Sequence, residues 1–151
     1  MKRILTGLLA AALCLSLCAC SQGEKADFDP AGDAQALLRA DGAFSSSLTQ
    51  IDQATACALY GIDEDTVTGC AVYASPSSAE ELAIFTLRSG QAAEDAAAAL
   101  QRRVEDRTEE LEDYMPGETG KLEAAVVETR GCSALLVIAA DYGPVNDFLE
   151  G

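Results

Sequence analysis

The stretch from Ser89 to about Tyr114 restricts the possible folds of this chain more than any other part of the sequence. Its apolar residues recur at intervals of three and four, the spacing that puts side chains on one face of an α-helix. They are Ala93, Ala96, Ala97, Leu100, Val104, Leu111 and Tyr114. Pro116-Gly117 and Gly120 follow where such a helix would end. A helix this long must bury its stripe of Ala and Leu, and we expect it to cross one face of a β-sheet.

Four segments have the pattern of β-strands, and they come in two pairs. Residues 67–74 alternate between two faces and residues 82–87 favour β-structure, with Ser75-Pro76-Ser77-Ser78 as a hairpin loop between them. The second pair covers residues 122–129 and 133–140. Every residue of 134–140 is apolar, which predicts a central strand covered on both faces.

Shorter helices are expected before and after these elements. Ser47 is a plausible N-cap for a helix that runs to Tyr60, and Gly61 stands where a left-handed C-terminal residue is common. A last short helix is expected over residues 144–149. The order predicts an α+β fold, with a small, mostly antiparallel four-stranded sheet of two hairpins packed by one long helix.

The N-terminus has the pattern of an exported protein. Met1-Lys2-Arg3 is positively charged, and residues 4–17 form an apolar run that is too short to span a membrane. Leu17-Cys18-Ala19-Cys20 then resembles the lipobox of bacterial lipoprotein precursors. That resemblance implies cleavage between Ala19 and Cys20 and a diacylglycerol group on the Cys20 sulfur. An ordinary secretory signal is the alternative interpretation.

These features predict three parts of the chain. Residues 1–19 are a lipoprotein signal peptide. Residues 20–43, which are rich in Gly, Asp and Ala, are a flexible acidic tether with room for a short helix around residues 33–39. Residues 44–151 form a single α+β domain.

Residue types that are rare or missing exclude several classes of function. The 151 residues include 25 acidic and 10 basic side chains, for a net charge of -15. Because nucleic acids are bound through Lys and Arg, we expect no nucleic-acid partner and no polybasic membrane patch. The sequence has no His, which removes Ser-His-Asp and Cys-His nucleophiles and the two-His zinc motif. We expect no enzymatic activity, no catalytic residue, no cofactor and no metal site.

Three cysteines follow Cys20, and two interpretations of them stay open. Cys57, Cys70 and Cys132 are odd in number and contain no Cys-x-x-Cys pair. Cys70 and Cys132 both fall on or beside predicted strands, so they are the pair to test for a disulfide. Thiols that pack as small apolar residues are the favoured alternative.

Two acidic segments bear on cation binding. Asp27-Phe28-Asp29-Pro30-Ala31-Gly32-Asp33 has part of a calcium-loop pattern. Ala31 and Leu38 occupy two of the ligand positions, so this loop cannot complete a calcium shell. The predicted long helix ends in a row of like charges that oppose its dipole: Glu105, Asp106, Glu109, Glu110, Glu112 and Asp113. A solvated helix face is the favoured interpretation, and a divalent-cation sensor is a lesser alternative.

Several short motifs together are similar to those of a known family. They are Leu48-Thr49-Gln50-Ile51-Asp52, Leu59-Tyr60-Gly61-Ile62-Asp63, Ala79-Glu80-Glu81-Leu82-Ala83-Ile84-Phe85, Tyr114 before Pro116, and Lys121-Leu122-Glu123. With the lipobox and the acidic tether, they resemble an uncharacterised lipoprotein family of Gram-positive anaerobes, classed only as a domain of unknown function. The similarity covers most of residues 44–148. It implies an extracytoplasmic lipoprotein, supplies no catalytic or binding residue, and weakly suggests a role near O-acylation of envelope polymers.

The lipobox and the missing catalytic residues lead to one main expectation about function. We expect a non-enzymatic binding or accessory module of the cell envelope, anchored to the outer face of the cell membrane through lipid on Cys20. Its expected partners are the membrane and an envelope protein. The alternative is an accessory factor in cell-envelope polymer modification, with at most weak enzymatic activity through carboxylates.

Overall fold

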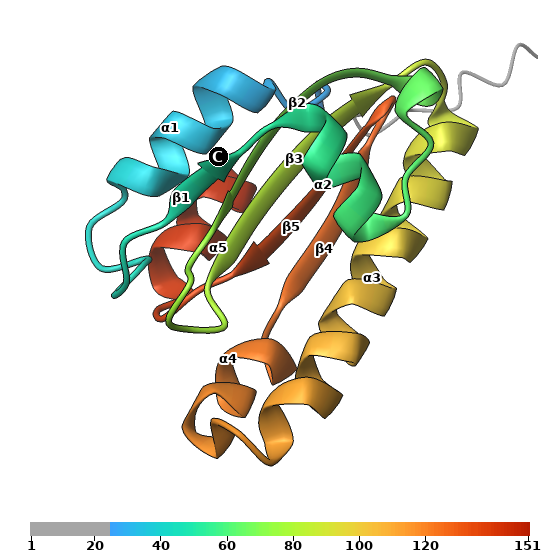
Figure 1. Cartoon of the computed structure of the whole chain (residues 1–151). Helices are drawn as coiled ribbons and strands as arrows, with labels where there is room; N and C mark the ends of the chain where they lie inside the picture. The colour runs from blue at the N-terminus through green and yellow to red at the C-terminus, as the bar shows by residue number, and fades with distance from the viewer. Residues whose placement is uncertain (1–24) are drawn as a thin grey trace, which may run out of the picture.

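The computed structural model describes residues 25–151, so the predicted signal peptide, the Ala19–Cys20 cleavage position and the lipidation site lie outside the described residues. Figure 1 shows the arrangement of the elements. In chain order they are α1 (Pro30–Arg39), β1 (Thr49–Ile51), α2 (Gln53–Tyr60), η1 (Glu64–Thr66), β2 (Val67–Ala74), β3 (Glu81–Leu87), α3 (Gly90–Glu112), η2 (Pro116–Glu118), α4 (Thr119–Glu123), β4 (Val126–Arg130), β5 (Ser133–Ile138) and α5 (Gly143–Glu150).

The strands form one antiparallel sheet in the order β1-β2-β3-β5-β4. The α+β class and the two hairpins, β2–β3 and β4–β5, are confirmed. The hairpins join through β3 and β5, where Leu82 is paired with Val137 and Ile84 with Leu135. The sheet has five strands, however, so the expectation of four was wrong.

The fifth strand is β1, which occupies residues that we expected to be helical. Its Thr49 and Ile51 pair with Ala74 and Val72 of β2. Helix α2 starts only after Asp52, whose side chain accepts a hydrogen bond from the Thr55 backbone N–H at 3.0 Å. Leu48 and Ile51 are three residues apart, a spacing that fits a helix. The open edge of β2, however, offers this segment backbone hydrogen-bond partners. Asp52 is as good an N-cap as Ser47, so the helix can begin after it.

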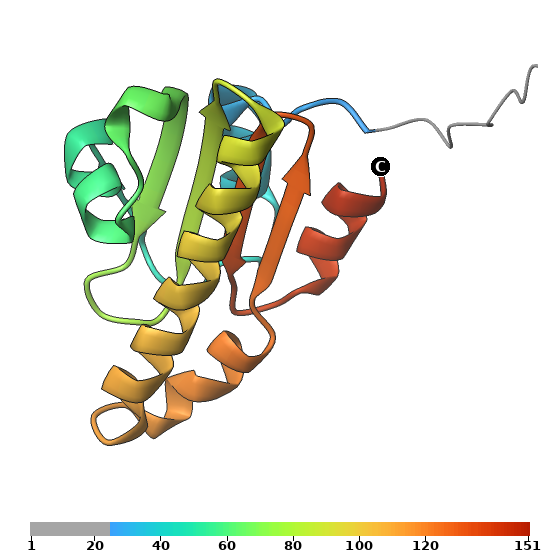
Figure 2. The ribbon, with the colours of Figure 1, turned by 90° about the vertical axis from the view of Figure 1, so that its right-hand side faces the viewer.

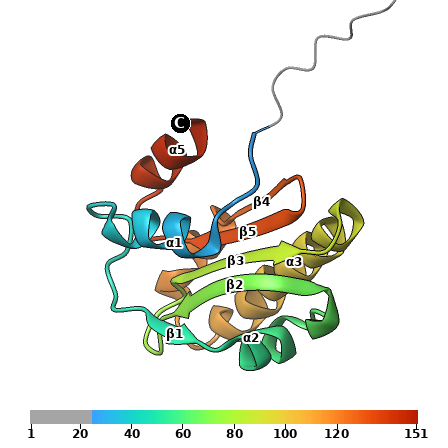
Figure 3. The same ribbon diagram turned by 90° about the horizontal axis from the view of Figure 1, so that it is seen from above.

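Helices cover both faces of the sheet, as the view from above shows (Figure 3). On one face, α2, α3 and α4 pack over a cluster that includes Phe85 and Leu136. On the other, α1 and α5 pack over Leu82, Ile84 and Leu135. Every residue of β5 is therefore buried, which confirms the predicted strand with two covered faces, although β3 is the middle strand of the sheet.

From residue 25 onward the structure differs from the flexible tether expected over residues 20–43, although the short helix expected around residues 33–39 is present as α1. Helix α1 packs on the sheet, and Phe28, Leu37 and Ala43 are at most 2% exposed. The Phe28 backbone N–H donates to the Ser133 hydroxyl at 2.8 Å, and the Ala43 carbonyl accepts from the Ala140 N–H at 2.8 Å. The few large apolar residues of this segment share one face, and the sheet buries them, so the domain begins near Phe28 and not at residue 44.

The long helix is confirmed as α3, which Figure 2 shows running along the sheet. Ser89 caps it by accepting a hydrogen bond from the Ala92 N–H at 3.2 Å. Its predicted apolar face is buried at Ala93, Ala96, Leu100, Val104 and Leu111. Tyr114 lies beyond the helix end and is 87% exposed.

The end of the chain matches the prediction in part. Residues 119–123, placed partly in a strand by the sequence, form α4, and β4 begins at Val126. The last helix is confirmed as α5. Within residues 25–151, no helix combines the length and the apolar character needed to cross a membrane.

Candidate ligand-binding site

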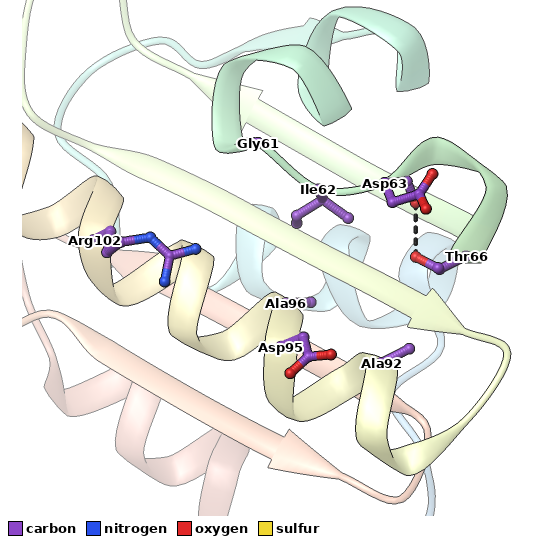
Figure 4. Close-up of a pocket in the computed structure, with 8 residues that line it drawn as sticks. All are labelled: Gly61, Ile62, Asp63, Thr66, Ala92, Asp95, Ala96 and Arg102. Carbon is purple, nitrogen blue, oxygen red and sulfur yellow. Dashed lines mark hydrogen bonds between the residues drawn. The ribbon is translucent and has the colours of Figure 1, made fainter.

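A surface groove of about 290 Å³ lies between the end of α2 and the N-terminal half of α3. Figure 4 shows the residues that line it. They are Gly61, Ile62, Asp63, Thr66, Ala92, Asp95, Ala96 and Arg102. Polar and charged side chains thus surround a small apolar floor, which is a common pattern for a small-ligand site.

One wall of the groove is made by the turn after α2. Gly61 ends the helix in the left-handed conformation, with φ of 67°, as the sequence predicts. The chain then reverses, so that Ile62 is buried while the exposed Asp63 begins η1. Asp63 accepts a hydrogen bond from the Asp65 N–H at 3.1 Å, and the Thr66 hydroxyl donates to the Asp63 carbonyl at 2.6 Å. These bonds fix the position of the Asp63 side chain at the rim.

The other wall is one face of α3. Asp95 and Arg102 are seven residues apart, so they lie on the same face and about 10 Å apart along the helix axis. Ala92 and Ala96 lie beside them and are too small to fill the space. Asp95 accepts a hydrogen bond from Gln91 at 3.2 Å. Arg102 is exposed and takes part in none of the ion pairs between described residues.

A second hollow, of about 330 Å³, lies beside β4 and contains Lys25 and Arg130. Both cations donate to the Leu149 carbonyl at the end of α5, Arg130 at 3.1 Å. Arg130 also pairs with Glu128 at 2.7 Å and lies over the Phe28 ring. Because these charges already bind the ends of the chain to the sheet, the groove between α2 and α3 is the better candidate for a ligand.

Two buried glutamates at the start of β3 are the least expected polar groups in the fold. Glu80 accepts hydrogen bonds from the Ser45 and Ser46 N–H groups, both at 2.9 Å, and from Lys121 at 2.8 Å. Burial alone would raise the pKa of Glu80, but the hydrogen bonds from Lys121, Ser45 and Ser46 outweigh it and hold the pKa below its usual value. Glu80 therefore joins the loop after α1 to α4.

Glu81 makes a second connection, between α2 and α3. It accepts a hydrogen bond from the Tyr60 hydroxyl at 2.6 Å and pairs with Arg103 at 3.2 Å. Burial, followed by the Glu81 charge, raises the pKa of Tyr60 well above its ordinary value. Since the protein itself supplies the partners of both carboxylates, we assign Glu80 and Glu81 to the stability of the fold and not to the binding of a ligand.

The three cysteines of the domain are free thiols. Cys57 is buried, whereas Cys70 and Cys132 are half-buried. Cys70 is paired with Phe85 on β3, which is paired in turn with Ala134 on β5, so another strand separates it from the Cys132 end of the sheet. Burial raises the pKa values of Cys57 and Cys70, which disfavours the reactive thiolate.

The acidic segments that resemble cation sites have partners within the protein itself. Asp27 accepts a hydrogen bond from the Cys132 N–H at 3.1 Å, and Asp33 accepts one from the Asp29 N–H at 2.8 Å. At the end of α3, Glu110 is 57% exposed and pairs with Arg107. Among residues 25–151, no group of three or more His, Cys, Asp or Glu residues is placed to hold a metal ion.

Sequence reasoning did not identify the residues of the groove. The spacing of seven between Asp95 and Arg102 is visible in the sequence, but it is common on exposed helix faces. Asp63 comes next to them only because α2 packs beside α3. The burial of Ile62 beneath them likewise depends on tertiary structure.

Comparison with known proteins gives one match. No curated protein and no solved structure has significant similarity to the chain. Residues 40–139 match the family model DUF4358, described as a domain of unknown function. This range includes the groove, both glutamates and all five strands. Because the match covers well over half of its 151 residues, the chain belongs to the DUF4358 family.

Proposed function

We propose that this protein is a membrane-anchored extracytoplasmic lipoprotein whose domain is a non-enzymatic binding or accessory module of the cell envelope. The lipobox that ends at Cys20 supports the anchor. The groove between α2 and α3 is the observation that carries the binding role. Its charged groups, Asp63, Asp95 and Arg102, are exposed and able to meet a ligand.

The position of Lys25, where the described residues begin, limits how far the domain can stand from the membrane. Lys25 is five residues after Cys20, and five residues span at most about 18 Å when fully extended. Lys25 donates to the Leu149 carbonyl, and Phe28 is buried in the domain. A lipid on Cys20 would therefore hold the domain close to the lipid surface, within reach of membrane proteins and of membrane-proximal polymers.

Crosslinking in intact membranes tests this proposal. Tagged wild type, Cys20→Ala and the groove variant Asp63→Asn/Arg102→Gln would be crosslinked and purified, and their partners identified by mass spectrometry. We expect a specific envelope partner with wild type, its loss with Cys20→Ala, and weaker capture with the groove variant. Equal capture by all three proteins would contradict both the anchor and the groove as the basis of binding.

The short connection to the membrane also favours the second candidate, an accessory role in envelope-polymer modification. Such a role requires the domain to work beside a membrane-bound modifying enzyme. A deletion strain should then contain less modified polymer, and only a copy with Cys20 should restore it. An unchanged polymer in the deletion strain would refute this candidate.

A further inference from the structure

The groove between α2 and α3 has opposite charges at its two ends. In Figure 4, Arg102 lies at one end, with its side chain directed along the groove, and Asp63 with Thr66 lies at the other. Asp95 adds a second carboxylate on the α3 side. A ligand with only negative groups would be repelled by Asp63 and Asp95, whereas a simple cation would leave Arg102 unused.

The middle of the groove is apolar and narrow. Ile62 and Ala96 lie between the charged ends, and Ala92 lies beyond Asp95 at the Thr66 end. The volume of about 290 Å³ is at the small end of the range for ligand pockets. The ligand's central part should therefore be short and carry small side chains.

The distance between the backbone positions of Asp95 and Arg102 guides the choice of ligand length. Asp95 and Arg102 are about 10 Å apart along the axis of α3. In a free amino acid the ammonium and carboxylate groups are next to each other and cannot reach both ends. Three extended residues of a peptide span about 10 Å, with an ammonium at one end and a carboxylate at the other.

We propose that this groove binds a short zwitterionic peptide of three residues with small side chains. Its carboxylate pairs with the Arg102 guanidinium, and its ammonium pairs with the carboxylates of Asp63 and Asp95. This inference rests on the proposed binding function and names the class of ligand. Because all three charged side chains of the protein are exposed, each ion pair contributes modestly to the binding free energy. Binding should therefore weaken as salt is added.

Tri-alanine is the probe that tests this assignment. The full chain, purified in detergent, would be titrated with tri-alanine and with N-acetyl-tri-alanine amide, which lacks both terminal charges, and binding followed by saturation-transfer NMR. We expect the blocked peptide to bind about thirtyfold more weakly, because it loses three exposed charge contacts worth about threefold each. No binding of tri-alanine, or equal binding of the two peptides, would overturn the inference.

Matched variants locate the site. Arg102→Gln and Asp63→Asn should each weaken tri-alanine binding about threefold. Arg39→Gln removes the same charge from an exposed position on α1, on the other face of the sheet, and should leave binding unchanged. An equal effect of Arg39→Gln and Arg102→Gln would refute the groove as the site. If either groove variant melts at a lower temperature, Asp95→Asn tests the same charges.

A flotation assay on the same preparations separates this inference from the proposed function. Wild type should float with lipid vesicles whether or not tri-alanine binds. If wild type floats with the vesicles but does not bind tri-alanine, only the peptide assignment is overturned. A wild-type protein that binds tri-alanine but does not float would contradict the anchor and leave the groove assignment supported.

Discussion

Replacing Phe28 with Ala tests whether the segment before residue 44 belongs to the folded domain. The Phe28 side chain is 2% exposed and packs with Leu37 and Leu82 on the α1 face of the sheet. Replacing a buried Phe with Ala typically lowers the free energy of unfolding by about 3–5 kcal/mol. The Arg130 guanidinium, 4.2 Å from the ring centroid, adds about 0.5–1 kcal/mol. We therefore expect Phe28→Ala to lower the free energy of unfolding by about 5 kcal/mol.

Urea denaturation followed by circular dichroism measures this loss. Phe28→Leu keeps most of the buried apolar surface, so it should cost only about 1 kcal/mol and serves as the control. A flexible tether would give a different result, because substitutions in exposed segments change stability by less than about 0.5 kcal/mol. A loss that small for Phe28→Ala would refute the assignment of residues 28–43 to the domain.

Three further predictions concern the buried glutamates and the turn after α2. Arg103→Met leaves the buried Glu81 without its cation and should lower the free energy of unfolding, measured with urea, by about 3 kcal/mol. Arg107→Met, at an exposed ion pair, should lower it by less than about 1 kcal/mol. Equal losses would contradict the role of Glu81. The pKa values of Glu80 and Glu118 are lowered in the folded protein. Their contribution to stability should therefore be complete above pH 4.5 and lost as the pH falls through the lowered pKa values. A Glu80→Gln variant that unfolds in acid at the same pH as wild type would refute this. Gly61→Ala forces a left-handed residue and should cost about 1 kcal/mol, while Gly117→Ala, where φ is not positive, should cost almost nothing in thermal melts.

The regular elements could be predicted because each has a local signal in the sequence. The long helix follows from the spacing of Ala93, Leu100 and Val104, and the strand β5 follows from an unbroken apolar run. Strand β1 and the packing of helix α1 on the sheet could not be predicted in this way. Three residues of β1 are too few for a periodic pattern, and α1 is recognisable as part of the core only once the sheet gives Leu37 a place to pack.

The polar sites were harder to predict because their partners are distant in the sequence. Glu80 and Glu81 are adjacent, but their cations, Lys121 and Arg103, are 41 and 22 residues away. Glu81 begins β3 and bonds to α2 and α3, whereas Glu80 precedes the strand and bonds to α4 and the loop after α1. The groove depends in the same way on the packing of α2 beside α3, which places Asp63 at the end of the groove opposite Arg102.

The proposed anchor depends on lipid at Cys20, and the intact mass of the protein shows whether that lipid is present. The protein would be extracted from membranes, purified and weighed by mass spectrometry beside a Cys20→Ala variant. We expect wild type to lack residues 1–19 and to carry a diacylglycerol on Cys20, and we expect the variant to carry no lipid. A wild-type protein whose mass shows an unmodified Cys20 would contradict the account.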